Sequence, residues 1–243
     1  MNKLNITKIG LLVSSIICFT CGPSSTEPGK GSILSFPLEQ GNRWEYEQYY
    51  YEILMSNNSV SDTVITRDVR RIIGVDTAPE TQGLIIVDDS LTIESSGDTA
   101  SVLIERSWWR HLNGKIFEVA YGSGVIGDII SPVFWENPRL LLDYPLISSK
   151  RWVLEYNSYG AVNKVVTGIE DYQFQDTLFN CALVTTSING EPASMITDWY
   201  SEAGLIHSQA ITGPIYIHDG IGNIVDSLFS YQNYYLRNID IAN

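Results

Sequence analysis

Cysteine is scarce in this chain of 243 residues, and the places of its three copies limit their chemistry. Cys18 and Cys21 lie near the N-terminus, so Cys181 is the only cysteine in the rest of the chain. A lone cysteine cannot form an intrachain disulfide, and the body must be held together by its core. The residues on either side of Cys181 are largely apolar, and no adjacent base would lower its pKa. Cys181 is therefore predicted to be a buried structural residue rather than a nucleophile.

Basic residues are also few. The chain has 15 Lys and Arg against 28 Asp and Glu, which gives a formal net charge of −13 at pH 7. Without a basic run it has no electrostatic footprint for nucleic acid, so nucleic acid is excluded as an expected partner. The same acidity disfavours lying flat on an anionic lipid surface. The acids are scattered along the chain, as on a solvated surface.

The short motifs of common enzymes are missing. There is no Gly-x-Ser-x-Gly, no Gly-x4-Gly-Lys-Ser/Thr and no His-Glu-x-x-His. The three histidines lie far apart in sequence, and no metal-ligand spacing is present, so neither a metal nor a cofactor is predicted. The acidic pairs Asp88-Asp89 and Glu170-Asp171 leave one enzymatic alternative open, a hydrolase that cleaves carbohydrate through a carboxylate pair.

The N-terminus carries the pattern of a secretory signal. Lys3 and Lys8 precede eleven uncharged residues, 9–19, and a basic segment before a short apolar one is typical of a signal peptide. A membrane-spanning helix needs about 20 apolar residues, so this segment is too short to be one.

The spacing Cys18-x-x-Cys21 admits a redox pair, a metal knuckle or a lipobox. A redox pair should open a helix after a strand, and zinc needs two more ligands nearby, which are absent. We therefore predict that Cys21, followed by Gly22, is lipidated, with plain secretion as the alternative. The Gly-, Pro- and Ser-rich residues that follow predict a flexible tether. The predicted organisation is a lipoprotein signal peptide over residues 1–20, the lipidated cysteine and tether over 21–33, and one extracytoplasmic β-rich domain over 34–243.

Strand patterns fill this domain. Runs of β-branched and aromatic residues are bounded by Gly, Asn, Asp and Pro. Asn113-Gly114 predicts a two-residue hairpin loop and Glu202-Ala203-Gly204 a three-residue one. Strands are predicted over residues 44–54, 64–75, 101–112, 115–121, 151–156, 161–172, 181–188, 194–201, 205–211, 215–218 and 224–236. No long helical stretch competes, so we predict an all-β fold: a single antiparallel domain built as a curved sheet, half-barrel or sandwich.

The two halves of the domain share a pattern. An FPL triplet and, later, a YPL triplet are each followed after four residues by Arg-Trp, ending at Trp44 and Trp152. Trp109 and Trp199 each stand five residues before a glycine. These matches predict an internal two-fold repeat, in which Trp44 corresponds to Trp152 and Trp109 to Trp199 at buried strand positions.

An apolar segment from Gly122 to Ile147 joins the proposed halves. Gly127 and Pro132 argue against a regular helix, and a loop this long and apolar needs something to cover it. It either plugs the core or forms the lip of an apolar groove that takes an acyl chain or a partner protein. The second interpretation gives the candidate ligand-binding residues Val125, Ile126, Ile129, Ile130, Phe134 and Trp135.

The stretches FPLEQGNRWEY, YPLISSKRW, FNCALV and WYSEAGLI resemble recurring marks of uncharacterised bacterial envelope lipoproteins. Those proteins repeat an aromatic-Pro-Leu-turn-Trp motif and end in a Trp-Tyr-x3-Gly-Leu-Ile hairpin. The resemblance runs from Phe36 to Ile206 and implies an extracytoplasmic β-rich domain, but it implies no activity. The expected protein is a non-enzymatic, membrane-anchored lipoprotein of the cell envelope, placed at the outer membrane on its periplasmic or surface side. It is expected to bind an amphiphile such as a lipid, or a partner protein.

Overall fold

The fold is described from a computed structural model, which covers residues 32–61, 63–93, 101–188 and 191–242. The regular elements of these residues are all strands. They are β1 (Arg43–Leu54), β2 (Val64–Val75), β3 (Ile85–Ile93), β4 (Ser101–Leu112), β5 (Lys115–Val125), β6 (Val133–Asp143), β7 (Arg151–Asn157), β8 (Gly160–Phe174), β9 (Thr177–Ile188), β10 (Glu191–Ser201), β11 (Gly204–His218) and β12 (Ile224–Asp240). Within this part of the chain, no helix has the length and apolar character needed to cross a membrane.

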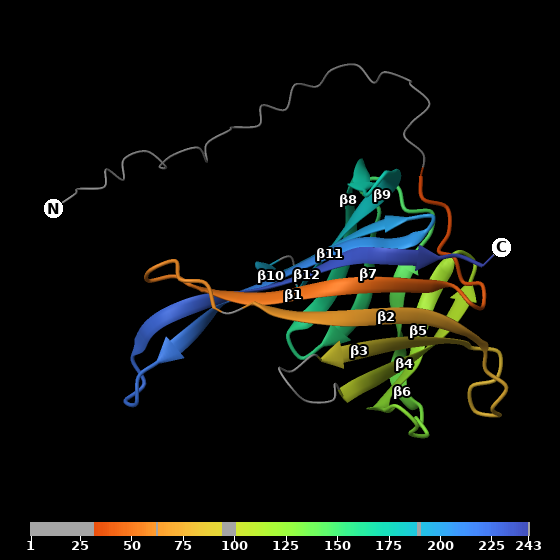
Figure 1. The fold of residues 1–243 in the computed structure, drawn as a ribbon, viewed down its shortest axis with the longest axis horizontal. Coiled ribbons are helices and arrows are strands. Elements are labelled where there is room, and N and C mark those ends of the chain that lie inside the picture. Colours follow the sequence, from red (N-terminus) through yellow and green to blue (C-terminus); the bar gives the residue numbers. More distant parts are fainter. Residues whose placement is uncertain (1–31, 62, 94–100, 189–190, 243) are drawn as a thin grey trace, which may run out of the picture.

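The strands form one antiparallel sheet in the order β6-β5-β4-β3-β2-β1-β12-β11-β10-β9-β8-β7. Strands that follow one another along the chain pair with each other, except β6 and β7, which are the two edges, and β1 pairs with β12 at the centre of the sheet. The sheet is strongly curved, and the β11–β12 hairpin projects away from its body (Figure 1). The prediction of an all-β domain with a curved antiparallel sheet is confirmed.

The curvature brings the two edge strands, β6 and β7, close together. They are not joined by a ladder of backbone hydrogen bonds, because they stand at opposite ends of the strand order. Side chains bridge them instead. Trp152 Nε1 donates a hydrogen bond to the carbonyl oxygen of Leu140 at 3.0 Å, and Arg139 Nε lies 2.6 Å from Glu155 Oε2. The sheet is therefore nearly closed into a barrel, with a side-chain seam between β6 and β7.

The segment before β1 fills the space enclosed by the sheet. The ring of Phe36 lies 5.5 Å from that of Trp44, 5.9 Å from that of Trp109 and 6.4 Å from that of Tyr200, which stand on β1, β4 and β10. A backbone bridge between Ile33 and Leu146 ties the segments that precede β1 and β7 to each other. The main core therefore joins strands from both halves of the sheet.

The predicted two-fold repeat is visible in the turns that precede β1 and β7. Gly41 and Ser149 both have positive φ, 97° and 70°. The Gly41 amide donates to the Ile72 carbonyl oxygen at 2.9 Å, and the Ser149 amide donates to that of Val166 at 2.8 Å. A left-handed residue is what such a turn needs, and Ser149 adopts this conformation although it is not glycine. Trp44 and Trp152 follow as the second residues of β1 and β7, and both are buried, as predicted.

The repeat continues into β2 and β8. The pairing of β2 with β3 shifts register between Ile72 and Gly74, and the pairing of β8 with β9 shifts between Val166 and Gly168. Each bulge begins at the residue, Ile72 or Val166, whose carbonyl oxygen accepts the hydrogen bond from the turn. Because a bulge bends a strand and increases its twist, the two halves curve in the same place.

The predicted match of Trp109 with Trp199 is wrong. Trp109 is buried in the main core, whereas Trp199 is only half-buried. A register shift in the β4–β5 hairpin separates Trp108 from Trp109, and one in the β10–β11 hairpin separates Trp199 from Tyr200. Aligned on these bulges, Trp199 corresponds to Trp108 and Tyr200 to Trp109. The glycine spacing was misleading because the β4–β5 hairpin is longer beyond its bulge.

The same correspondence appears in two hydrogen bonds just after the bulges of β2 and β8. Trp108 Nε1 donates to Asp76 Oδ2 at 2.6 Å, and Trp199 Nε1 donates to Glu170 Oε1 at 2.7 Å. Asp76 and Glu170 each stand two residues after the bulge glycine of their strand. The halves therefore share an indole-to-carboxylate contact that the sequence pattern did not reveal.

The prediction of a long apolar loop from Gly122 to Ile147 is also wrong. Most of that segment is strand: β5 runs to Val125 and β6 begins at Val133. β6 was missed because Pro138 interrupts its pattern, and its register with β5 is irregular. β3 was missed because Asp88-Asp89 lie within it. Residues 205–211 and 215–218 belong to the single strand β11, whose register shifts between them.

Candidate functional site

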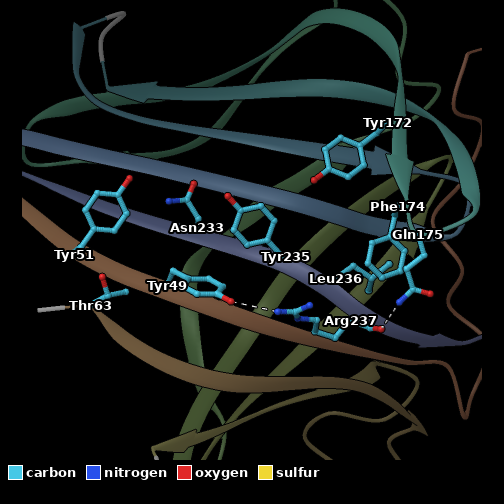
Figure 2. Close-up of a pocket in the computed structure, with 10 residues that line it drawn as sticks. All are labelled: Tyr49, Tyr51, Thr63, Tyr172, Phe174, Gln175, Asn233, Tyr235, Leu236 and Arg237. Atoms are coloured by element: carbon cyan, nitrogen blue, oxygen red, sulfur yellow. Dashed lines mark hydrogen bonds between the residues drawn. The ribbon is translucent and has the colours of Figure 1, made fainter.

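A groove of about 630 Å3 lies on the outer face of the sheet and is here called the outer groove. Its floor is β12, one wall is formed by β1, and the other is the end of β8, which crosses in front of the sheet (Figure 2). The crossing is fixed by Gln175, whose Nε2 donates to the Arg237 carbonyl oxygen at 3.4 Å. The residues lining the outer groove are Tyr49, Tyr51, Thr63, Tyr172, Phe174, Gln175, Asn233, Tyr235, Leu236 and Arg237.

A row of aromatic rings runs across the strands beside and beneath this groove. Trp199, His207 and Tyr235 lie on β10, β11 and β12 at paired positions, because Trp199 pairs with His207 and His207 with Tyr235. Successive ring centroids are 4.6 Å and 4.7 Å apart. Tyr49 extends the row onto β1, with its ring edge-on to Tyr235 at 5.7 Å. Tyr172 covers the row from β8, stacked on His207 at 5.5 Å.

His207 acts in this row as a neutral aromatic ring. Its Nδ1 lies 2.7 Å from the carbonyl oxygen of Tyr234, which can only accept, so Nδ1 carries the proton. Burial disfavours the charged form and lowers the pKa of His207 below its ordinary value. At neutral pH the imidazole therefore stacks between Tyr172 and Tyr235 without a charge.

The charged groups at the groove neutralise one another. Arg237 forms an ion pair with Glu47, and its Nη2 also lies 3.2 Å from the Tyr49 hydroxyl. That hydroxyl in turn donates to Glu47 Oε2 at 2.5 Å. The groove therefore presents aromatic faces, hydroxyl groups and amides, with no net charge of its own.

A second cavity, of about 430 Å3, lies on the inner face of the sheet and is here called the inner cavity. Side chains from strands on both sides of the curve converge in it, as strand alternation requires. It is lined by Tyr46, Gln48, Asp68, Arg70, Asp89, Leu91, Glu105, Ile196, Asp198, Tyr200, Leu205, Ser208, Gln232 and Tyr234. Four of these residues are acidic and one is basic, so the inner cavity is polar and acidic.

Two of the four acids have defined partners. Arg70 and Asp89 form a bidentate pair, with Nε to Oδ1 at 2.7 Å and Nη2 to Oδ2 at 3.0 Å. Asp198 accepts a hydrogen bond from Ser208 Oγ at 2.7 Å and lies 4.0 Å from Lys164 Nζ. Burial lowers the pKa of Lys164, while Asp198 opposes that change.

Asp68 is the least compensated acid of the inner cavity. Its Oδ1 is buried without a hydrogen-bond partner among the described residues. Burial raises the pKa of Asp68 to about 7, and the neighbouring carboxylate of Asp89 adds to the shift while Arg70 opposes it. Asp68 therefore changes charge near neutral pH, which is unusual for a carboxyl group.

Neither acidic pair predicted from sequence forms a carboxylate pair. Asp88 and Asp89 are consecutive in β3 and so face opposite sides of the sheet. Asp88 is bound by Arg106, with Nε to Oδ1 at 2.6 Å, whereas Asp89 faces Arg70. Glu170 accepts from Trp199 on the outer face. The acids that do converge are Asp68, Asp89 and Glu105 on the neighbouring strands β2, β3 and β4, joined by Asp198 on β10.

The predicted ligand-binding residues are divided between different environments. Val125, Ile126 and Ile129 are exposed at the β5–β6 turn, and Ile129 is 96% exposed. Ile130 instead packs into a small outer cluster with Leu84, Trp108, Val119 and Ala120.

The last two of these predicted residues lie on β6. Phe134 is half-exposed on the outer face, whereas Trp135 stacks on Tyr121 at 4.6 Å and donates to Glu118 Oε2 at 2.9 Å. The six residues do not line one groove, and whether any of them binds a ligand stays a prediction. Cys21 lies outside the described residues.

Cys181 is fully buried, and burial raises the pKa of its thiol to about 12, which agrees with a structural role. Among the described residues, no group of three or more His, Cys, Asp or Glu is placed to hold a metal ion.

Comparison of the chain with protein-family models, with curated proteins and with solved structures finds no match. Any functional conclusion must therefore come from the geometry of the outer groove and the inner cavity.

Proposed function

We propose that this chain is a non-enzymatic, membrane-anchored lipoprotein of the cell envelope that binds an amphiphilic ligand in its outer groove. The observation that carries the proposal is the composition of the groove, in which aromatic faces lie beside hydroxyl, amide and guanidinium groups. Ligand pockets typically have this mixture, and a volume of about 630 Å3 lies within their usual range. The envelope location rests on the signal and lipobox patterns around Cys21.

The binding proposal is tested with the whole chain by native mass spectrometry against a panel of lipids, oligosaccharides and peptides. Retention of one ligand class by the wild type, and its loss in Tyr235→Ala, is the expected result. Tyr159, an exposed tyrosine in the turn between β7 and β8, supplies the matched control as Tyr159→Ala. Failure of every class to bind would contradict the proposal.

The anchor is tested separately. Mass spectrometry of membrane-extracted protein should find an N-terminal fragment that begins at Cys21 and is heavier than its peptide by acyl chains. A Cys21→Ser variant should move to the soluble extracytoplasmic fraction. A wild-type protein that is already soluble and begins at another residue would show that the lipobox interpretation is wrong.

A hydrolase that acts on carbohydrate is the second candidate, and the inner cavity is the observation that favours it. A carboxyl group whose pKa is raised to about 7 beside other carboxylates is typical of a general acid. The hydrolase candidate is weakened because Asp89 is paired with Arg70 and Asp198 is hydrogen-bonded to Ser208, so neither carboxylate is free to act with Asp68. Aryl glycosides provide the test: turnover by the wild type that is lost in both Asp68→Asn and Glu105→Gln would establish the hydrolase and displace the first proposal.

A further inference from the structure

The outer faces of the two halves carry corresponding rows of side chains that end differently. In the first half the row starts at Asp76 and passes through Trp108, Ala120 and Phe134 on β4, β5 and β6. The corresponding row of the second half is Glu170, Trp199, His207 and Tyr235. The correspondence rests on the shared bulges and on the equivalent indole-to-carboxylate bonds. The two rows therefore lie at the same place on the fold.

The first row is closed by the chain itself. Ile130, from the β5–β6 turn, is buried against Trp108 and Ala120. It lies directly on the β5 backbone, because a Cβ atom at Gly122 would stand only 2.7 Å from Ile130 Cγ2. The turn can fold back over this row because glycine leaves room for the isoleucine.

In the second row the cover comes from another strand, because the ring of Tyr172 on β8 lies 6.3 Å from that of Trp199 and 5.5 Å from that of His207. β11 and β12 run on to His218 and Ile224 before they turn, and this hairpin projects away from the body (Figure 1). The position that corresponds to Gly122 is Gln209, whose side chain donates to Asn233 Oδ1 at 3.2 Å. Tyr235, at the end of the row, is 40% exposed and lines the outer groove. Ile130 of the turn covers the first row, whereas Tyr172 covers the second, and the outer groove opens at the Tyr235 end of that row.

The lining of that groove indicates what could fill it. Of the ten lining side chains only Phe174 and Leu236 lack a polar group, and none is acidic. An acyl chain would cover the hydroxyls of Tyr51, Tyr172 and Tyr235 without offering them a hydrogen bond, which is costly for buried groups. A cationic ligand would find no free carboxylate, because Glu47 is paired with Arg237. The best complement is a neutral molecule with apolar faces and hydroxyl edges.

We propose that the outer groove is a saccharide-binding site, in which the C–H faces of sugar rings stack on Tyr235 and Tyr172 while their hydroxyls bond to Asn233, Gln175 and Arg237. The open ends of the groove suit an oligosaccharide rather than a single sugar. This inference rests on the proposed function and names the ligand class of the same site. Tyrosine serves such a ligand well, because each ring offers an apolar face and a hydroxyl group at low entropic cost.

The test uses the full chain, extracted in a detergent without a sugar headgroup so that the detergent cannot compete. It is applied to an array of neutral oligosaccharides, including cello-, xylo-, malto- and chito-hexaose, together with acidic glycans. Lysophosphatidylcholine is titrated in parallel as the lipid probe. The strongest saccharide is then titrated by calorimetry against the wild type and the variants Tyr235→Ala, Tyr235→Phe and Tyr172→Ala, with Tyr159→Ala as the control.

The expected result is binding of a saccharide, weakened by about tenfold or more in Tyr235→Ala and Tyr172→Ala. Tyr235→Phe should lose less, since it keeps the stacking face, and Tyr159→Ala should bind as the wild type does. Circular dichroism and thermal melting of each variant separate loss of binding from loss of fold.

Three outcomes overturn the inference, and they differ in whether the proposed function also fails. If lysophosphatidylcholine binds, no saccharide does, and Tyr235→Ala abolishes lipid binding, the saccharide assignment is wrong while the proposed function stands. If no probe binds, both fail. If a saccharide binds but Tyr235→Ala and Tyr172→Ala retain full affinity while folded, the outer groove is not its site.

Discussion

The first half of the sheet, β1 to β6, and the second half, β7 to β12, share a backbone plan and differ in the surfaces built on it. The shared features shape the chain: a left-handed residue before the first strand, a buried tryptophan in it, a bulge in the second strand and an indole-to-carboxylate contact at its end. The differences are in side chains on the two faces of the sheet. The two halves thus share their curvature, while the outer row is a closed cluster in the first half and ends in an open groove at Tyr235 in the second.

The inner face shows the same divergence in its charges. Arg70 and Lys164 stand at corresponding positions. Each lies two residues before the residue, Ile72 or Val166, whose carbonyl oxygen accepts the hydrogen bond from the turn. Arg70 makes a bidentate pair with an acid, whereas Lys164 lies 4.0 Å from its acid. Asp68 in the first half corresponds to the apolar Val162 in the second. The uncompensated carboxyl group therefore belongs to the first half alone.

The largest expected effect tests whether the buried tryptophans of the two halves contribute equally to the free energy of unfolding. Trp44→Ala and Trp152→Ala should each lower the free energy of unfolding by roughly 3–5 kcal/mol, because each removes a buried indole. Urea unfolding followed by circular dichroism measures both. Trp199→Ala, at the half-buried outer position, should cost clearly less. If Trp199→Ala lowered the free energy of unfolding by as much, Trp199 would correspond to the buried Trp109, and the alignment based on the bulges would be wrong.

Opening the closed half is the next largest change. Ile130→Ala should cost roughly 2–4 kcal/mol of unfolding free energy, since it empties the space over Gly122. Ile129→Ala is the matched control one residue away; that side chain is 96% exposed, and its loss should stay within about 0.5 kcal/mol. Thermal or urea unfolding compares them. Similar costs for the two variants would mean that Ile130 does not seal the first row.

A pH dependence should sharpen the contrast between Asp68 and Val162. Because the pKa of Asp68 is raised from 3.8 to about 7, the folded state holds a proton that the unfolded state has already released between those values. Its contribution to stability is therefore greatest at low pH and falls as pH rises toward 7.

Asp68→Asn should remove this dependence and stabilise the fold at pH 8 by on the order of 2 kcal/mol. This stabilisation is smaller than the free energy that corresponds to the whole pKa shift, because the asparagine amide is still a buried polar group. Urea unfolding of the variant and the wild type at pH 5 and pH 8 gives the comparison. A wild-type stability that does not fall between these values, relative to the variant, would contradict the assignment.

The smallest effect concerns the two indole contacts. Asp76→Asn should cost more than Glu170→Gln, although each should stay near about 1 kcal/mol. Asp76 also accepts from Thr81 Oγ1 at 2.6 Å and from the Ala78 amide at 2.9 Å, whereas Glu170 has a single indole contact at 2.7 Å. Differential scanning calorimetry can resolve the order. The reverse order would show that the second contact has become the more important one.

The fold class was accessible from sequence because strand formation is local. Alternating apolar residues and hairpin signals such as Asn113-Gly114 predicted most strands directly. The pattern failed where a strand carries charges that only the folded sheet neutralises, as at Asp88 and Asp89 in β3. It also failed at Pro138, where an irregular edge strand tolerates the proline.

The candidate site could be predicted only in fragments. Tyr49 belongs to the run Tyr49-Tyr50-Tyr51, but its neighbours in the outer groove come from β8 and β12, far away in the sequence. Tyr172 reaches them only because the end of β8 crosses in front of the sheet (Figure 2). That crossing depends on the bulge at Gly168 and on sheet curvature, neither of which has a local sequence signal. The choice of residues 125–135 followed apolar character, whereas the groove is made of amphipathic side chains.

The pairing of β1 with β12 has a mechanical consequence. The ladder begins where Arg43 lies opposite Asp240, so both ends of the domain leave the sheet at the same place. A pull applied at Arg43 and Asp240 would break the hydrogen bonds of this ladder one after another instead of shearing them together. Peeling would soon reach Tyr49 and Tyr235, which stand on the separating strands. The outer groove would thus come apart early under tension, while the edge strands β6 and β7 remained held at their seam.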